Sequence, residues 1–525
     1  MSRAIVGYTG FVGSNLLQFY KFDYFYNSSN FHEAANLEFD ELFFCGVPAV
    51  KWYANKYPEY DTSTINNIKQ ILKTIKAKKI ILISTIDVYE YTDLEYTEDY
   101  KCDILNNHTY GINRYMFEDF IQKNFTNYHI IRLPALFGKG LKKNIIYDLI
   151  TNNNIQNIST STYFQWYDLN WLKNDIDIII KQNIDICNLF TEPISTFEII
   201  KLFDYPVENF NNNSNLKYNT KTKYHKLFNS QISGYIRNKE SVLHNIRLFL
   251  KQNNIDKSKL VVSNICVKDI SNFQFSCILK LFGIQNIQIA PTTLIKNWDN
   301  LQELNFEQFN KNNISVYSFQ SISYGLNNLN IFDIDTSDSF FNHMKKMINF
   351  GILNNVKVFV FGCPKNRQIL DINNNNNDEI FCNFFKRVGE YIGDNNLTIC
   401  LEPNSKKYGC NYLNKIKEVG DIVKQINHKN IKMMVDIGNA IMENDNLTDM
   451  YMYKDVIYNI DISQENMLDF SNITQKHIDF KKILSNINYN KNINLEMLIK
   501  NDNDDGELIK LKKSLENFIN IYGSI

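Results

Sequence analysis

The chain has 525 residues, which is too long for one hydrophobic core and typical of about two to four domains. Hydrophobic residues make up 44% and charged residues 22%, as in ordinary globular proteins, and no apolar run is long enough to span a bilayer. The 56 basic and 57 acidic residues give a formal net charge of −1, so neither nucleic acid nor an anionic membrane is expected as a partner. The nine cysteines lack zinc-like spacing and the N-terminus lacks a signal-peptide pattern, which favours reduced thiols in the cytoplasm.

Short apolar strands alternate with helical patterns over the first 150 residues, which is typical of a parallel sheet with crossover helices. The predicted strands are Ala4–Gly7, Tyr24–Tyr26, Leu42–Cys45, Lys79–Ser84 and Tyr128–Leu133. A polar, Asn-rich stretch over residues 206–223 indicates a loose connection, and a helical stretch follows from Lys239 to Gln252. We therefore predict a first domain over residues 1–252 with a Rossmann-type, doubly wound parallel sheet.

The rest of the chain has a second rhythm of eight apolar runs, each followed by a helical or loop interval. The runs begin at Leu260, Ile284, Ile314, Val356, Leu397, Ile431, Val456 and Ile493. Eight βα units in about 265 residues match the usual size of a TIM barrel. We predict a (β/α)₈ barrel over residues 253–525.

A glycine motif, Gly7-Tyr8-Thr9-Gly10-Phe11-Val12-Gly13, directly follows the first predicted strand and opens a helix near Ser14. Its glycines allow a tight turn and let the backbone approach a pyrophosphate. The expected cofactor contacts are Gly7, Gly10, Phe11, Val12, Gly13, Asn27, Ser28 and Gly46. The second strand ends without an acidic residue, which favours NADP over NAD, although no Arg is present to bind the 2′-phosphate.

Residues 3–200 resemble the extended short-chain dehydrogenase/reductase family, the group of nucleotide-sugar epimerases and dehydratases. The resemblance rests on the glycine motif, on residues 84–89 (STIDVY), on residues 110–114 (YGINR) and on residues 132–134 (RLP). It implies that Thr85 and Tyr110 hold the reacting carbonyl or hydroxyl, that Tyr110 is the general acid/base, and that Asp87 and Arg114 belong to the same catalytic set.

Three departures from that family limit the carry-over. One is that only about 16 residues separate the second strand from the next one at Leu42, so the usual third βα unit is shortened. Arg114 stands where the family has Lys, which keeps the charge but not the compact ammonium. Asp87 is the single carboxylate of its segment, which makes dehydration less expected. Tyr110 as a packed core residue and Asp87 as a solvated strand end remain open alternatives.

Carboxylates end four of the last apolar runs, and these are Glu402, Asp436, Asp461 and Glu496. Active sites of TIM barrels lie at the carboxyl ends of the strands. Four carboxylates at one mouth are costly unless a cation or protons neutralise them. An all-oxygen set suits Mg²⁺ or Mn²⁺. Strand capping or pairing with Lys and Arg remains the alternative for each carboxylate.

Residues 260–500 resemble the xylose-isomerase-like family of sugar phosphate isomerases and epimerases. The resemblance implies that Glu402, Asp436, Asp461 and Glu496 bind the metal, and that Glu402 and Glu496 exchange protons at a sugar carbon. Asp461 stands where that family has a His, and Asn439 replaces a second His.

Four further residues are expected to contact the substrate, namely Gln320, Lys365, Arg367 and Asn439. Lys365 and Arg367 would suit a phosphate or carboxylate group, with ordinary surface charge as the alternative. Gln320 is a candidate for a hydroxyl contact.

Together these features predict a bifunctional carbohydrate enzyme. The first domain would oxidise, reduce or epimerise a sugar with NAD(P), and the barrel would isomerise or epimerise a sugar or sugar phosphate, as in synthesis of an unusual surface-glycan sugar. The alternative is that one domain is inactive and serves as a binding or scaffolding module. An endonuclease is rejected because the strand ends lack His ligands. The expected partner is a small sugar, and homo-oligomer formation is left open.

Overall fold

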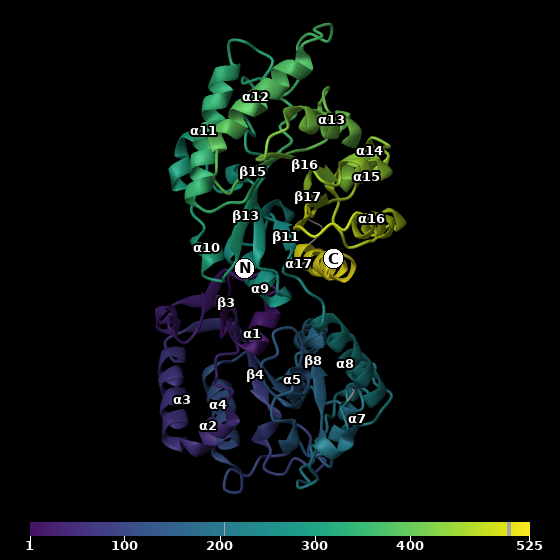
Figure 1. Ribbon diagram of the computed structural model, residues 1–525. Coiled ribbons are helices and arrows are strands. Elements are labelled where there is room, and N and C mark those ends of the chain that lie inside the picture. The colour runs from purple at the N-terminus through teal and green to yellow at the C-terminus, as the bar shows by residue number, and fades with distance from the viewer. Residues whose placement is uncertain (204, 501–505, 525) are drawn as a thin grey trace. The chain divides into compact units, whose positions relative to one another are not determined.

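The computed structural model divides the chain into two compact units, the N-terminal unit Met1–Asn254 and the barrel unit Ile255–Ile525 (Figure 1). It describes residues 1–203, 205–500 and 506–524. The division lies close to the boundary predicted between residues 252 and 253. Helix α8 (Lys239–Asn253) belongs to the N-terminal unit, because Val242 and Ile246 pack into its core.

A six-stranded parallel sheet in the order β2-β1-β3-β4-β5-β9 organises the N-terminal unit. Its strands are β1 (Arg3–Val6), β2 (Tyr24–Tyr26), β3 (Glu38–Phe44), β4 (Lys76–Thr85), β5 (Tyr128–Leu133) and β9 (Ile186–Asn188). One strand lies beyond β1, where a six-stranded Rossmann sheet has two, because only the short helix η1 (Phe31–Ala34) separates β2 from β3. The parallel sheet is confirmed, and the Rossmann assignment stays a prediction.

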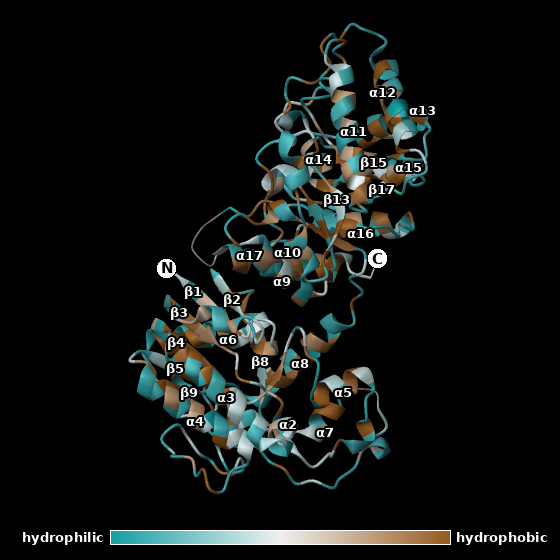
Figure 2. Cartoon of the chain, turned by 90° about the vertical axis from the view of Figure 1, so that its left-hand side faces the viewer, coloured by the Kyte–Doolittle hydropathy of each residue, from teal (hydrophilic) through white to brown (hydrophobic). Residues whose placement is uncertain are grey.

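Helices and two small sheets complete this unit. The helices are α1 (Phe11–Leu16), α2 (Lys51–Lys56), α3 (Pro58–Leu72), α4 (Thr109–Asn124), α5 (Ile145–Thr151), α6 (Leu172–Lys181) and α7 (Thr196–Ile200). The two-stranded sheets pair β6 (Ala135–Phe137) with β8 (Trp166–Asp168), and β7 (Tyr163–Phe164) with β10 (Ile194–Ser195). Figure 2 shows brown, hydrophobic segments gathered in helices and strands and teal segments in many loops.

The stretch 206–223 is anchored to the unit, contrary to the prediction of a loose connection. Backbone bridges join Asn211 to Ser159 and Lys217 to Tyr163. Thr220 is fully buried, and its backbone N–H and its hydroxyl donate to Oε1 of Gln165 at 3.1 and 3.2 Å. The polar composition therefore serves internal hydrogen bonds.

A buried ion pair ties α4 to the two central strands. Arg132 of β5 donates through Nη2 to Oε2 of Glu118 at 2.6 Å, and the two side chains are 2% and 0% exposed. Ser84 of β4 also donates to Glu118, at 2.5 Å. Because Thr85 follows Ser84 and Tyr110 lies on α4, this contact holds the two predicted catalytic elements together.

The barrel unit is a closed barrel of eight parallel strands, which confirms the predicted TIM barrel. The strands are β11 (Leu260–Ser263), β12 (Asn286–Ile289), β13 (Ser315–Phe319), β14 (Val358–Phe361), β15 (Thr398–Leu401), β16 (Ile431–Asp436), β17 (Ile457–Ile462) and β18 (Ile493–Leu495). Each strand lies within, or within one residue of, a predicted apolar run.

Helices follow the strands around the barrel. They are α9 (Asn272–Phe282), α10 (Glu307–Asn310), α11 (Ser337–Leu353), α12 (Asn377–Ile392), α13 (Ile416–Ile426), α14 (Ile437–Met442), α15 (Met450–Tyr453), α16 (Gln475–Asn486) and α17 (Gly506–Tyr522). No helix within the described ranges is long and apolar enough to cross a membrane.

Alternation along the strands brings polar groups to the mouth of the barrel. Val360, Cys400 and Met434 from three neighbouring strands pack in one cluster with side chains of two further strands. Because side chains alternate with a period of two, the residues two positions later, at 362, 402 and 436, share that inner face. Glu402 and Asp436 therefore point toward the carboxyl end of the barrel interior.

Replacing Glu118 with Ala should destabilise the N-terminal unit by about 3–5 kcal/mol, because Arg132 would remain buried without its counter-charge. Urea unfolding of the full chain measures this effect. Asp119→Ala is the control, since Asp119 forms an exposed i,i+4 pair with Lys123 on the same helix, worth about 0.5 kcal/mol. Equal losses of unfolding free energy in the two variants would contradict the stabilising role of the buried Arg132–Glu118 pair.

Candidate active sites

Four carboxylic side chains face one another at the carboxyl ends of β15 to β18. Glu402 and Glu496 directly follow β15 and β18, Asp436 ends β16 and Asp461 is the fifth residue of β17. Glu402, Asp436 and Asp461 are 9%, 6% and 1% exposed, and Glu496 is partly buried. The charges of Asp461, Asp436 and Glu402 all act on the Glu496 carboxyl. The fold thus brings all four together.

Burial and mutual repulsion raise the pKa values of these groups. Burial is the largest cause for each, and it raises the pKa of Asp461 to about 8, helped by the charge of Asp436. The pKa values of Glu402 and Glu496 lie well above the usual range, again through burial first and neighbouring carboxylates second. Each of these carboxyl groups therefore holds its proton more strongly than a solvated carboxyl does, and the four titrate as a coupled set.

Side-chain amides lie against the carboxyl groups. Asn439 donates from Nδ2 to Oε1 of Glu402 and to Oδ2 of Asp436, both at 3.0 Å. Asn459 donates from Nδ2 to Oδ1 of Asp461 at 2.8 Å. Asn439, predicted as a substrate contact, thus bridges two carboxylates.

Asp436 also caps a helix. Its Oδ1 accepts from the backbone N–H groups of Gly438 and Asn439 at 2.7 and 3.3 Å, at the start of α14. The hydroxyl of Ser463 donates to the same oxygen. Asp436 is therefore the N-cap of α14, in addition to its place among the carboxyl groups.

The arrangement does not fit a divalent cation as it stands. In the part of the chain that the structure describes, no three His, Cys, Asp and Glu side chains are placed to hold a metal ion. Both oxygens of Asp436 accept hydrogen bonds, and the Asn439 amide lies between Glu402 and Asp436. Binding of Mg²⁺ or Mn²⁺ stays a prediction.

Lys365 and Arg367 do not form the cation pair that their spacing suggested. Arg367 is fully buried and donates from Nε to Sγ of Cys410 at 3.4 Å, and its charge lowers the pKa of Glu402. Lys365 is exposed. Residues two apart in the loop after β14 need not point in the same direction. A phosphate or carboxylate group of a substrate would therefore meet Lys365 as the exposed cation of the two.

Gln320 is 3% exposed and lies beside Glu496, whose pKa it lowers. Neither polar atom of its amide has a partner within hydrogen-bond geometry among the described residues. The same holds for Nη1 of Arg367. These buried N–H groups are available to a ligand, since unpaired buried donors are rare in folded proteins.

Sequence analysis missed Tyr408 and Gly362. Tyr408 ends the short helix η10 (Lys406–Tyr408) after β15 and is 36% exposed. Partial desolvation, followed by the charges of nearby carboxylates, raises its pKa to about 12. A Cβ at Gly362 would overlap Glu402 and Asn404, so only glycine leaves room for the Glu402 carboxyl. The chain has 31 tyrosines, and nothing in the local pattern distinguishes Tyr408.

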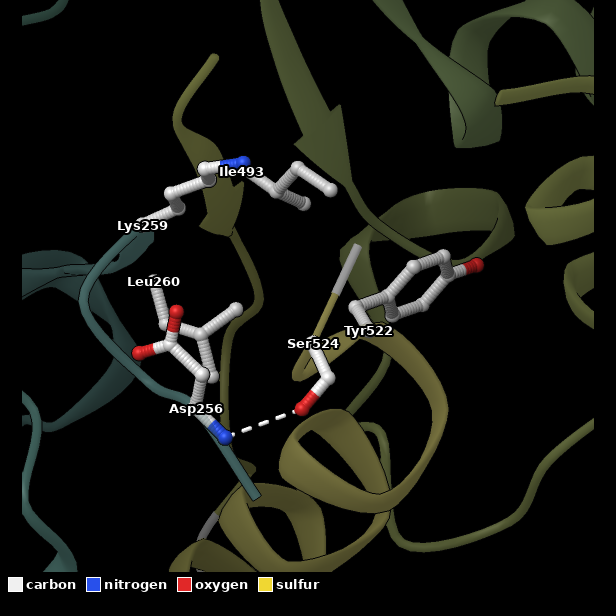
Figure 3. A pocket seen from close by; sticks show the side chains of 6 residues that line it. All are labelled: Asp256, Lys259, Leu260, Ile493, Tyr522 and Ser524. Carbon is white, nitrogen blue, oxygen red and sulfur yellow. Dashed lines mark hydrogen bonds between the residues drawn. The ribbon is translucent and has the colours of Figure 1, made fainter. Parts of the chain in front are cut away.

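A small hollow at the other end of the barrel is not part of this site. It lies at the amino ends of β11 and β18, where the side chains of Tyr522 and Ser524 also line it (Figure 3). Catalytic groups of TIM barrels come from the carboxyl ends of the strands. We therefore assign the hollow no catalytic role.

In the glycine turn of the N-terminal unit, a Cβ at two of the glycines would overlap the backbone, and a Cβ at the third would meet a single atom. Gly7 has φ of +88°, and a Cβ there would come within 2.5 Å of the Cys45 carbonyl. A Cβ at Gly13 would overlap the Gly7 carbonyl. A Cβ at Gly10 would meet only that carbonyl, at 3.2 Å. The turn lies where strand order reverses between β1 and β3, the usual ligand position in open parallel sheets.

The other predicted cofactor residues surround the same turn. Phe11 and Val12 begin α1, and Asn27 and Ser28 follow β2. Nδ2 of Asn27 donates to the Tyr8 hydroxyl at 3.3 Å, which joins the end of β2 to the turn. Gly46 follows β3, and a Cβ there would come within 2.7 Å of the Val6 side chain.

Thr85 and Tyr110 lie together at the end of β4. Burial raises the pKa of Tyr110 to about 12, while the charge of Arg114 and a hydrogen bond with Thr85 act to lower it. Arg114 lies 3.9 Å from the centre of the Tyr110 ring, but its guanidinium binds Asp61 at 2.5 and 2.9 Å. Arg114 also donates to the Pro48 carbonyl. Its charge is therefore largely committed to Asp61.

A second missed group is next to Asp87. Lys51, the first residue of α2, binds Oδ1 of Asp87 at 2.8 Å, and the hydroxyl of Tyr218 donates to the same oxygen at 3.0 Å. Asp87 is thus paired rather than a solvated strand end. Tyr218 comes from the Asn-rich stretch, which gave no sequence signal for a site.

Comparison with protein-family models matches residues 281–517 to the xylose isomerase-like TIM barrel family. The matched residues lie within the barrel unit. The match spans less than half of the chain, and the short-chain dehydrogenase/reductase resemblance of residues 3–200 remains a prediction. No curated protein matches the chain.

Solved structures that overlap about half of the chain include three sugar epimerases. The 3-keto-D-glucoside 4-epimerase from E. coli has 12% identity and a TM-score of 0.40, covering 49% of this chain and 99% of that one. The D-psicose 3-epimerase from Clostridium cellulolyticum H10 has 15% identity and a TM-score of 0.40, with 49% and 94% covered. The D-allulose 3-epimerase from Methylomonas sp. has 14% identity and a TM-score of 0.42, with 51% and 98% covered.

Gly10→Ala should weaken binding of NADP⁺ and NAD⁺ about tenfold or more while the fold survives, because the new methyl group would occupy the space of a pyrophosphate. Calorimetric titration of the full chain measures binding. Gly13→Ala is the contrast, since its methyl group collides with the Gly7 carbonyl and should also destabilise the unit. Wild-type protein that binds neither nucleotide would refute the dinucleotide site.

Proposed function

We propose that the barrel unit is a sugar isomerase or epimerase that moves a proton between two carboxyl groups. One observation carries this proposal, namely that Glu402 and Glu496 belong to one cluster of four carboxyl groups at the barrel mouth and have pKa values well above the usual range. A carboxyl that exchanges protons near neutral pH is a suitable general acid or base. The xylose isomerase-like match supports a sugar as substrate.

The proton transfer uses the two glutamates in opposite protonation states. The ionised one removes a proton from the carbon next to the sugar carbonyl. In epimerisation the protonated one returns a proton to the other face of the same carbon. In isomerisation it returns the proton to the former carbonyl carbon, and the hydroxyl proton of the first carbon moves to the former carbonyl oxygen. The enediolate oxygen formed between these steps needs donors, and the buried N–H groups of Gln320 and Arg367 are suited to that role. With one exposed cation at Lys365, both free and phosphorylated sugars remain candidate substrates.

For the N-terminal unit we propose NAD(P) binding at the glycine turn, with Thr85 and Tyr110 at the reacting centre. The single neighbour that a Cβ at Gly10 would meet, and the reversal of strand order beside the turn, support binding. With both units active, the chain would catalyse two steps on related sugars, as in synthesis of a surface-glycan sugar. The engagement of Arg114 by Asp61 favours the second candidate, a unit that binds cofactor without turnover.

Glu402→Gln and Glu496→Gln should each reduce isomerisation or epimerisation by about 10²-fold or more, because an amide cannot exchange the proton. Free and phosphorylated ketoses incubated in D₂O, followed by mass spectrometry, give the rate of deuterium incorporation. The wild-type rate should fall at both low and high pH, since one carboxyl must be ionised and the other protonated. Unchanged incorporation in both variants would refute the two-carboxyl mechanism.

A further inference from the structure

At the barrel mouth, side-chain amides donate hydrogen bonds to three of the four carboxyl groups. We infer that this centre works without a resident metal ion, and that Asn439 is the positioning residue that holds Glu402 and Asp436 together. The inference rests on the proposed function for its catalytic meaning. Its test measures metal binding without turnover, so the two can fail separately.

The Asn439 amide uses its full donor capacity on the two carboxylates. The NH₂ group has two hydrogens, and its two acceptors, Oε1 of Glu402 and Oδ2 of Asp436, both lie at 3.0 Å. An ion bridging these oxygens would have to displace the amide. Asn439 is 3% exposed and its backbone N–H also donates to Asp436, so the side chain is held on the first turn of α14.

The remaining oxygen of Asp436 is also occupied. Oδ1 accepts from the backbone N–H groups of Gly438 and Asn439 and from the Ser463 hydroxyl. Three donors saturate a carboxylate oxygen, which leaves no lone pair for a cation. A cation here would need the start of α14 to change.

Asp461 has side-chain amides as neighbours in addition to the other carboxyl groups. Asn459 donates to its Oδ1 at 2.8 Å, and Asn494 is its register partner on β18. Asn494 in turn donates to Oε1 of Gln288 on β12 at 2.9 Å. These amides form a buried polar layer across β17, β18 and β12. The positive ends of their N–H dipoles offset negative charge that a cation would otherwise offset.

Asn439→Asp reverses this arrangement, because it removes both donors and adds a fifth carboxylate. We expect wild-type protein to retain less than about 0.1 equivalent of divalent metal after purification, measured by plasma mass spectrometry. Its Tm in 1 mM MnCl₂ and in 1 mM EDTA should agree within about 1 °C, whereas Mn²⁺ should raise the Tm of Asn439→Asp by about 5 °C or more.

The matched control is Asn430→Asp. Asn430 is buried to a similar degree, at 7% exposed, and it precedes β16 at the opposite end of the barrel. This variant should show no Mn²⁺ response, and a response equal to that of Asn439→Asp would overturn the role of Asn439. About one equivalent of bound metal in wild type, or a wild-type Tm raised by Mn²⁺, would overturn the inference even if Asn439→Asp fails to fold.

Discussion

Crowding of four carboxyl groups at one barrel mouth is the constraint on which the site depends. At an effective dielectric constant of about 20, two unit charges 5 Å apart repel by about 3 kcal/mol, so four ionised groups could not persist together. Two features reduce this repulsion. Burial favours the protonated forms, and the amides of Asn439 and Asn459 donate hydrogen bonds to the carboxyl groups. Shared protons and fixed dipoles make the same group suited to proton transfer at a sugar carbon.

Ion pairs between different elements set the charge balance of the N-terminal unit. The ion pair of Arg132 with Glu118 holds α4 against the sheet, so Tyr110 meets Thr85. Arg114, which follows Tyr110 by one helical turn, instead binds Asp61 of α3. Lys51, paired with Asp87, is the more exposed cation near this centre, at 39% side-chain exposure. The unit therefore retains a polar centre whose cation comes from a different element.

The strand positions and the cluster of four carboxylic side chains could be predicted from the sequence, because both follow from period-two alternation within apolar runs. The Asp436 cap and the Asn439 contact follow from a three-residue spacing that matches a helix start, although their joint bridge to Glu402 needs the barrel closed. Arg367 and Lys365 could not be separated, because loop direction decides which one is buried. The contact of Tyr218 with Asp87 could not be predicted, because Tyr218 lies in a polar stretch whose position depends on hydrogen bonds to residues distant in the sequence.

The most direct test of this account is proton exchange by metal-depleted protein. Full-length chain is dialysed against EDTA, its residual metal is measured by plasma mass spectrometry, and deuterium incorporation from D₂O into a ketose panel is followed by NMR. The account predicts that exchange continues at the untreated rate with less than about 0.1 equivalent of metal present, because Glu402 and Glu496 act with amide support alone. Exchange that stops on depletion and returns with Mn²⁺ or Mg²⁺ would contradict it.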